Sequence, residues 1–520
     1  MTRLLPLALL ALLAGPVLAQ PASAPPRPES GQQARQDTAA PTPDRSTEHT
    51  LSLPGRTPFR FTATVSTVRL ANDAGAPQAD LVLTSFTSPG DNRPVTFAVN
   101  GGPGASSAWL NLGALGPWRL PMGDGAPSPV TPPIPVDNTE TWLPFTDLVF
   151  IDPAGTGYSR VLGGDDARRR LFSVDGDVSS LAEAIRRWLD ANNRLVSPKF
   201  IAGESYGGFR GPRLVRALRQ EQGVGVSGLV LVSPVLDFGG RQNELDPLNW
   251  VARLPSMAAA AAAAPGRAAL REAEEYAAGD YLLDLVRGES DRAAVARASE
   301  RVAALTGLDP ALVRRRAGRV DLGTFLRERG SHAPGEPPRI ASAYDATVTM
   351  PDPFPAAAND NAPDPLLTGL RAPLTSAAAG LYAGRLNWQP EAGRRYEVLN
   401  ESVNRAWDYG RGGRPESVGS LRVSLALDPA FRVLVVHGLY DLVTPYFASK
   451  LLLDQLPPLG PIGQVRLRAY PGGHMFYSRD ASRAAFTADA EALIGAAAGT
   501  PPPPTTPLPA GGTPFAPATR

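Results

Sequence analysis

Five short apolar runs, each closed by a loop rich in glycine or proline, limit the possible folds more than any other feature of the sequence. They span residues 95–99, 148–151, 200–202, 229–232 and 433–436. Continuous apolar runs of this length are typical of strands buried on both faces of a parallel sheet. Helical patterns lie between them, as over residues 178–189, where Leu181, Ile185 and Trp188 share one face. This alternation predicts an α/β fold with a mostly parallel central sheet flanked by helices.

The first nineteen residues have the pattern of a secretory signal peptide. Arg3 gives a positive start, residues 4–13 are apolar apart from Pro6, and residues 17–19 offer a small-residue cleavage site. The apolar stretch is short for a membrane span, which argues against a retained anchor. We therefore expect an exported, bacterial-type protein, periplasmic or extracellular, with no membrane insertion after the signal is removed.

The remaining chain divides by composition. Residues 20–45 are rich in proline, alanine and glutamine and are expected to form a disordered linker, and residues 499–520 a disordered proline-rich tail. The catalytic body is expected over 46–498. It opens with two segments, 59–65 and 79–86, whose alternation of apolar and polar residues predicts half-exposed antiparallel strands.

Between residues 240 and 400 the pattern changes to arginine-, alanine- and glutamate-rich segments with helical spacing. We interpret this stretch as a helical cap inserted between two late strands of the sheet. The alanine run 258–264 has high helix propensity but little surface for packing, which predicts an exposed helix.

The charge balance and the absence of cysteine exclude several classes of site. The chain has 51 basic and 50 acidic residues, a formal net charge of +1, and so gives no electrostatic reason to expect nucleic acid as a partner. Without cysteine there is no thiolate metal site, and three of the four histidines have no second ligand at metal-binding spacing. We expect no cofactor and no metal. The oligomeric state is left open.

The sequence Gly203-Glu204-Ser205-Tyr206-Gly207 lies between a predicted strand at 200–202 and a predicted helix at 209–220. In a G-x-S-x-G motif the serine sits on a sharp, strained strand-to-helix turn, and small neighbours make that turn possible. The turn exposes the hydroxyl above the sheet. The alternative is a glycine-rich turn that merely contains serine, but the strand and helix around it favour a nucleophile elbow and an α/β-hydrolase fold.

A serine nucleophile needs a general base and a carboxylate that orients it. The candidates for the base are His49, His332, His437 and His474. In this fold the order along the chain is serine, acid, histidine, and each follows a strand. His474 satisfies this order, whereas His437 ends a buried strand and is better explained as a structural histidine bonded to backbone. Asp441, after the strand at 432–436, is the predicted acid; Asp454, in a helical pattern, is its rival.

The glycine-rich loop 100–104 follows the predicted strand at 95–99. Such a loop lets backbone N–H groups approach a developing oxyanion closely. The N–H groups of Gly102 and Tyr206 are therefore predicted to form an oxyanion hole. The alternative is an ordinary tight turn. A phosphate-binding loop fits poorly, because no Gly-Lys-Ser/Thr follows.

Several separated motifs together resemble the serine carboxypeptidases, the S10 peptidases. They are residues 100–107 (NGGPGASS), 151–159 (IDPAGTGYS), 203–208 (GESYGG) and the segments around Asp441 and His474. The resemblance implies removal of C-terminal residues from peptides. It implies that Asn100, Gly101 and Glu204 bind the terminal carboxylate, with Glu204 donating a hydrogen bond when protonated.

The resemblance also implies that Asp152 and Tyr158 lie near the leaving group, although Asp152 could equally be a loop cap. Some positions depart from the family pattern. Ala105 stands where many members have cysteine, Ala98 where many have tryptophan, and a second carboxylate-binding glutamate expected near Ala114 is missing. Arg119, nearby, is a candidate substitute for that glutamate as a carboxylate clamp.

Three functions remain open from the sequence. The first is a serine-type carboxypeptidase that acts on peptides through an acyl-enzyme on Ser205. The second is a secreted esterase or acyltransferase with the same Ser205, Asp441 and His474. The third is an inactive binding protein on a hydrolase scaffold.

Overall fold

The computed structural model describes residues 40–53, 57–123, 127–239, 245–330, 337–356, 362–391, 393–410 and 415–499. The predicted signal peptide at 1–19, most of the predicted linker at 20–45 and all but the first residue of the predicted tail at 499–520 lie outside these residues.

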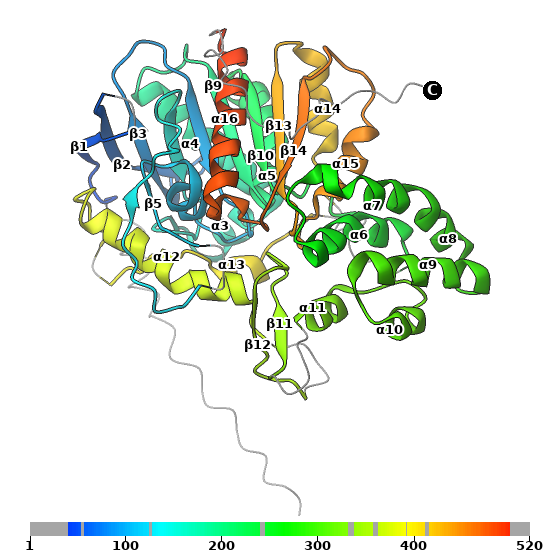
Figure 1. Cartoon of the computed structure of the whole chain (residues 1–520). Helices are drawn as coiled ribbons and strands as arrows, with labels where there is room; N and C mark the ends of the chain where they lie inside the picture. The colour runs from blue at the N-terminus through cyan, green and yellow to red at the C-terminus, as the bar shows by residue number, and fades with distance from the viewer. Residues whose placement is uncertain are drawn as a thin grey trace, which may run out of the picture. The chain divides into compact units, whose positions relative to one another are not determined.

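A single large sheet forms the centre of the described body (Figure 1). Its strands, in spatial order, are β1 (Arg45–Leu51), β2 (Phe59–Ala71), β3 (Pro77–Thr87), β7 (Asp147–Ile151), β4 (Val95–Val99), β9 (Lys199–Glu204), β10 (Gly228–Val232), β13 (Arg432–Gly438) and β14 (Val465–Tyr470). The short β8 (Arg160–Val161) pairs with β3. The first three strands and β7 pair antiparallel, and every pair from β7 to β14 is parallel. The fold is an α/β-hydrolase fold, as the sequence predicts.

Alternate residues of each central strand enter two different cores, because successive side chains of a strand point to opposite faces. In β4, Phe97 packs with α4 (Val174–Ala191), α5 (Tyr206–Glu221) and α14 (Val418–Leu427). Its neighbour Ala98 faces the other core, with α12 (Pro365–Ala383) and α16 (Asp480–Ala497). Both faces of these strands are therefore covered, which explains their continuous apolar sequences.

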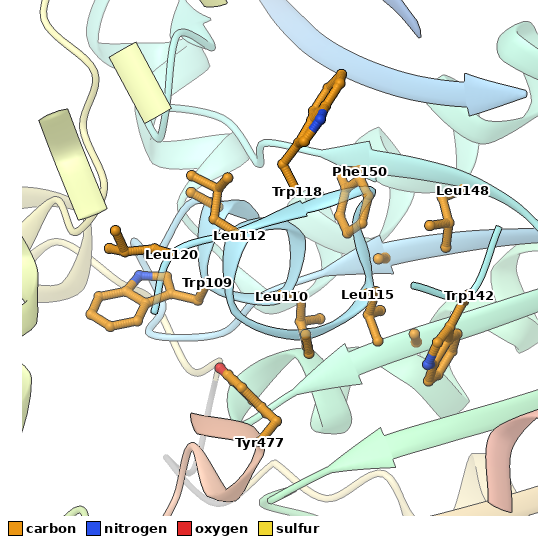
Figure 2. Packing of buried hydrophobic residues seen from close by; sticks show 14 of the residues in the cluster. Trp109, Leu110, Leu112, Leu115, Trp118, Leu120, Trp142, Leu148, Phe150 and Tyr477 are labelled. Carbon is orange, nitrogen blue, oxygen red and sulfur yellow. The ribbon is translucent and has the colours of Figure 1, made fainter. Parts of the chain in front are cut away.

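The core that contains Ala98 also includes a short helical stretch, which follows the glycine-rich loop. It consists of α2 (Ala108–Leu110) and the π-helical turn η1 (Asn111–Leu115). Figure 2 shows its side chains packed with Trp118, Trp142 and Phe150, and with Tyr477 beside it. The strands β5 (Trp118–Arg119) and β6 (Val136–Asp137) form a small sheet directly after it. The helix α3 (Gly164–Leu171) precedes α4.

Helices fill the chain between β10 and β13, the two late strands between which the cap was expected (Figure 1). They are α6 (Pro247–Ala262), η2 (Arg267–Leu270), α7 (Arg271–Tyr276), η3 (Ala277–Tyr281), α8 (Leu282–Arg287), α9 (Arg292–Thr306), α10 (Pro310–Arg315) and α11 (Leu322–Gly330). The hairpin β11 (Arg339–Ala341) and β12 (Thr349–Pro351) and the helices α12 and α13 (Glu401–Arg405) follow. The last elements are α15 (Tyr446–Asp454) and η4 (Phe476–Ser478), with α16 at the end.

The prediction of an exposed helix is wrong for the first residues of the alanine run, Ala258 to Ala260, whereas Ala262 and Ala263 are exposed. Ala259 and Ala260 are 0% exposed, and α6 lies in the middle of a core shared by the inserted helices. Small side chains allow the neighbouring helices to approach this face closely, so the run packs through its backbone and methyl groups rather than through large side chains. The folded part of the chain also includes residues at the end of the predicted linker, since Trp388 Nε1 donates to Pro43 O at 3.0 Å.

Candidate active site

Ser205 occupies a strained turn between β9 and α5. Its backbone has φ 60° and ψ −118°, a conformation that non-glycine residues rarely adopt. The turn is held by the Ser205 N–H, which donates to Val232 O at 2.9 Å, and by the Gly208 N–H, which donates to Ser205 O at 2.9 Å. A Cβ at Gly203 would collide with the carbonyl oxygen of Gly207. The glycine of the motif therefore makes the sharp turn sterically possible.

Asp441 and His474 lie in the loops after two neighbouring parallel strands, β13 and β14. His474 Nδ1 is 2.7 Å from Asp441 Oδ2, and both side chains are buried. Burial opposes ionisation of Asp441, but the charge of His474 and the hydrogen bonds from His474 and Thr444 outweigh it and hold the pKa of this carboxyl below its usual value. The pair is the arrangement in which a carboxylate orients an imidazole base.

The loop around Asp441 fixes the carboxylate through its own backbone. Oδ1 accepts the N–H of Val443 at 2.8 Å and that of Thr444 at 2.9 Å, and Oδ2 accepts the Thr444 hydroxyl at 2.5 Å. These bonds fix the orientation of the carboxylate, so that Oδ2 also faces Nδ1 of His474. Thr444 is a residue that sequence reasoning missed.

The inserted segment also contacts His474. The backbone N–H of His474 donates to Tyr344 O at 2.5 Å. The Tyr344 ring meets the imidazole edge-on, with the ring centroids 5.3 Å apart. A Cβ at Gly473 would collide with that same carbonyl of Tyr344. The insertion between β10 and β13 therefore contributes directly to the position of the imidazole, and no sequence motif pointed to Tyr344.

The rival candidates occupy other environments. His437 is fully buried, with Nδ1 3.0 Å from Thr444 O and Nε2 2.9 Å from the Ser449 hydroxyl, which confirms the prediction of a structural histidine bonded to backbone. Asp454 ends α15 and pairs with Lys450. His49 lies in β1, and its Nε2 is 2.8 Å from the Thr47 hydroxyl. His332 lies outside the described residues.

The glycine-rich loop packs directly on the serine turn. A Cβ at Gly101 would lie 2.5 Å from Tyr206 N, 2.7 Å from Glu204 O and 2.9 Å from Ser205 Cβ, so only glycine allows this approach. Gly102 follows with φ +96°, in the region that favours glycine. The structure thus brings together the two segments whose N–H groups, those of Gly102 and Tyr206, were predicted to form an oxyanion hole.

A buried carboxyl lies directly beside the serine. Glu204 is 3% exposed, and its Oε2 accepts hydrogen bonds from Asn100 Nδ2 and from the Tyr477 hydroxyl, each at 2.9 Å. Burial raises the pKa of Glu204 to about 7, although His474 and the two hydrogen bonds favour the charged form. Asn100 and Glu204, two of the three residues that the resemblance placed at the carboxylate, are thus in contact, and Gly101 lies against the backbone of Glu204.

A buried ion pair contacts the backbone of Asn100. Arg210 Nε lies 2.5 Å from Asp177 Oδ2, and Arg210 also donates to Asn100 O. Both charged side chains are buried, so each depends on the other. The pair joins α4 and α5 to the end of β4, and sequence reasoning did not single it out.

Asp152 is hydrogen-bonded to a backbone N–H and to a tyrosine hydroxyl. Its Oδ1 accepts the Ser107 N–H at 2.8 Å, and its Oδ2 accepts the Tyr396 hydroxyl at 3.2 Å. Burial raises its pKa to about 6. These bonds match the loop-cap alternative. Tyr158 lies in a cluster of aromatic rings, with its centroid 5.0 Å from that of Tyr396.

The positions that depart from the family pattern are also placed by the structure. Ala98 and Ala114 are buried in the core on the α16 side of the sheet, as is Ala105 at the edge of that core. Arg119 Nη2 lies 3.6 Å from Asp480, while its Nε is buried without a hydrogen-bond partner among the described residues, and its role as a carboxylate clamp stays a prediction. The residue that reaches Glu204 instead is Tyr477.

Two wider properties bear on the chemistry. Over the described ranges, no cluster of three or more histidine, aspartate or glutamate side chains has the geometry to hold a metal ion. Nor does any helix in that part of the chain combine the length and apolar character of a membrane span.

Comparison with known proteins finds similarity to one peptidase family over the part of the chain that contains Ser205. Residues 82–256 match the family described as serine carboxypeptidase, Peptidase S10. Serine carboxypeptidase-like 42 of Arabidopsis thaliana is 31% identical over 173 residues, which cover 32% of this chain and 34% of the relative. The pheromone-processing carboxypeptidase KEX1 of Fusarium vanettenii is 28% identical over 130 residues, 25% of this chain and 19% of the relative. The matches thus span about a third or less of the length of these relatives.

Among solved structures, that of Kex1(delta)p, a prohormone-processing carboxypeptidase from Saccharomyces cerevisiae, shares the fold. It covers 84% of this chain and 91% of its own with a TM-score of 0.53 at 14% identity. The sequence match at 82–256 includes the glycine-rich loop, the Asp152 segment and the serine turn. Residues 82–256 are thus similar to the serine carboxypeptidase family, Peptidase S10, and the described chain shares the fold of a solved carboxypeptidase.

Proposed function

We propose that this protein is a serine-type carboxypeptidase that removes C-terminal residues from peptides through an acyl-enzyme on Ser205. The observation that carries the proposal is the combination of a strained serine turn with a buried acid next to it. Ser205 lies on the turn, Glu204 precedes it with a pKa near 7, and the Asp441–His474 pair lies on the neighbouring strands.

In the proposed reaction Ser205 is the nucleophile and His474 moves the proton in each step. Ser205 Oγ attacks the carbonyl carbon of the last peptide bond while neutral His474 accepts its proton. Asp441 holds the imidazole in the required tautomer and stabilises the imidazolium. The N–H groups of Gly102 and Tyr206 bind the oxyanion. His474 then protonates the leaving amine, and water, activated by the same base, releases the shortened peptide and restores Ser205.

Recognition of the C-terminus is assigned to Asn100, Gly101 and Glu204. A neutral Glu204 donates a hydrogen bond to the substrate carboxylate, whereas an ionised one repels it. Since the pKa of Glu204 is near 7, the preference for a free C-terminus should be full in acid and fall as the pH rises through about 7. Peptides are the proposed substrates, and export through the signal peptide at 1–19, to the periplasm or the cell exterior, stays a prediction.

The decisive test compares a peptide with a free C-terminus and its amidated twin, followed by mass spectrometry from pH 4 to pH 8. We expect stepwise trimming of the free peptide only, abolished by Ser205→Ala. Asp441→Asn should lower the turnover by about 10⁴-fold, because the imidazole loses its orienting carboxylate. The control is Asp454→Asn, the rival acid that pairs with Lys450 on α15, which should leave turnover unchanged.

Other outcomes identify the alternatives. If neither peptide is trimmed but a fluorophosphonate still labels Ser205, the proposal is wrong, and an esterase or acyltransferase is the better assignment. If the probe labels nothing, the site is not catalytic, and a binding protein on a hydrolase scaffold is favoured.

A further inference from the structure

Tyr477 lies next to the proposed carboxylate site although it is 273 residues away from Glu204 in sequence. It belongs to η4, the turn that follows the His474 loop, and is fully buried. A Cβ at Gly113 would lie 2.6 Å from Tyr477 Cε2, so the ring fills the space beside η1. Figure 2 shows it projecting from η4 toward the helical stretch that carries Trp109 and Leu110. This is the region, near Ala114, from which the expected second glutamate is missing.

The hydrogen bonds around Glu204 are unevenly shared between its two oxygens. Asn100 Nδ2 and the Tyr477 hydroxyl both donate to Oε2, at 2.9 Å each, and no described residue donates to Oε1. A carbonyl-type oxygen has two lone pairs, so two donors saturate Oε2. A proton on Oε2 would have to displace one of these bonds, whereas a proton on Oε1 displaces none.

We propose that Tyr477 is a positioning residue of the carboxylate site: with Asn100 it keeps Oε2 of Glu204 as an acceptor, so that the proton of the neutral acid lies on Oε1 and is donated to the C-terminal carboxylate of the peptide. This inference rests on the proposed function. It assigns to the Tyr477 phenol the role expected of the second glutamate that is missing near Ala114.

A phenol differs from a carboxyl in how the site responds to pH. The groups that act electrostatically on Glu204 or are acted on by it are His474, Asp441, Tyr477 and Tyr344. Burial raises the pKa of Tyr477 well above its ordinary value, so the phenol stays neutral over the working range. Tyr477 therefore adds no second titration step of its own beside Glu204, as an adjacent carboxyl would, and His474 is the titratable base that acts on Glu204.

The test measures binding, so that it does not depend on turnover. Ser205→Ala protein would be titrated calorimetrically with the free and amidated peptides from pH 5 to pH 9. We expect the preference for the free peptide to disappear with a midpoint near pH 7. Adding Tyr477→Phe removes a donor that stabilises the ionised carboxyl. It should move the midpoint upward by about one pH unit and weaken binding of the free peptide about tenfold.

Two further variants separate positioning from general damage. Glu204→Gln reproduces the neutral acid, since its carbonyl can face Asn100 and Tyr477 while its amide donates to the ligand, and it should keep the preference up to pH 9. Tyr446→Phe removes the same kind of bond elsewhere, from a buried phenol to Glu274 Oε1 at 2.9 Å, and should not move the midpoint.

The outcomes distinguish the two proposals. If the free peptide is preferred but Tyr477→Phe leaves both midpoint and affinity unchanged, the role of Tyr477 is wrong and the carboxypeptidase proposal stands. If the two peptides bind equally at every pH, there is no carboxylate site, and both proposals are overturned. Thermal unfolding of each variant checks that the fold is retained.

Discussion

Two buried carboxyl groups in this chain, Asp152 and Glu204, have their pKa raised mainly by burial, to about 6 and about 7. Their hydrogen bonds separate their roles. Asp152 uses both oxygens to hold the Ser107 N–H and the Tyr396 hydroxyl. Glu204 uses one oxygen for its neighbours, and Oε1 is free of donors from the described residues. A raised pKa alone therefore does not identify the residue that meets the substrate, whereas the direction of the bonds does.

The raised pKa of Asp152 has a consequence for stability that Asp152→Asn isolates. In the unfolded chain this carboxyl titrates near 3.8 and in the folded chain near 6, so the folded state holds the proton more tightly. Stability from this group is complete below about pH 4 and is lost as the pH rises through about 6. Relative to the wild type, the free energy of unfolding of Asp152→Asn should rise by about 3 kcal/mol between pH 4 and pH 7.

Denaturant unfolding at a series of pH values measures this difference. Asp291→Asn serves as the control of opposite sign, because hydrogen bonds from Ala294 and Ala293 lower the pKa of this exposed helix cap. Its stability relative to the wild type should fall as the pH rises. If the difference in unfolding free energy between Asp152→Asn and the wild type does not change with pH, the raised pKa of Asp152 is wrong.

At the scale of elements, the parallel order of β4, β9, β10, β13 and β14 brings the candidate site together. The carboxyl ends of parallel strands meet at one edge of the sheet, and the loops that follow them gather there. The glycine-rich loop follows β4, the serine turn follows β9, and the Asp441 and His474 loops follow β13 and β14. Their distances depend on how closely the backbones of these loops pack.

Gly101→Ala tests that backbone packing. The added methyl group would lie 2.5 Å from Tyr206 N, so the loop must move away from the serine turn. We expect the rate of substrate turnover to fall by about 10²–10³-fold, the usual cost of one displaced oxyanion donor. Gly225→Ala is the control, because no atom lies within 4 Å of its added Cβ. Equal kinetics for the two variants would rule out the loop as part of the oxyanion hole.

At the scale of the whole described body, the inserted helices and the Asp441 loop share one core. Leu439, Tyr440 and Leu442, which flank Asp441, pack in the same cluster as Phe325 of α11. The Tyr440 hydroxyl donates to Ala264 O at 2.7 Å, directly after α6. Residues of the insertion thus stabilise the loop that carries the acid, in addition to Tyr344, which holds His474.

This shared core predicts that damage to the insertion reaches the active site. Phe325→Ala removes a fully buried ring and should lower the free energy of unfolding by about 3–5 kcal/mol. Unfolding followed by circular dichroism and loss of fluorophosphonate labelling should shift together to lower denaturant concentration. Leu283→Ala, at a site 56% exposed on α8, should change neither. Labelling that persists after the insertion has unfolded would show that the two parts are independent.

The sequence alone predicted the features that depend on local pattern. The strand at 95–99, the helix after Ser205 and the order of serine, acid and histidine follow from apolar runs, glycine spacing and chain order, because backbone geometry is dictated by neighbours along the chain. Ser205 and Glu204 could be named from one motif for the same reason.

The tertiary structure decided what depends on residues far apart. Tyr477 meets Glu204 across 273 positions, and Tyr344 reaches His474 from the insertion. Burial of Ala259 and Ala260 in α6 depends on which helices pack against them, a property that helix propensity does not contain. Such contacts arise only when strands and loops assemble at one sheet edge. The sequence could therefore identify the reacting groups, but only the folded chain determines which side chains position them.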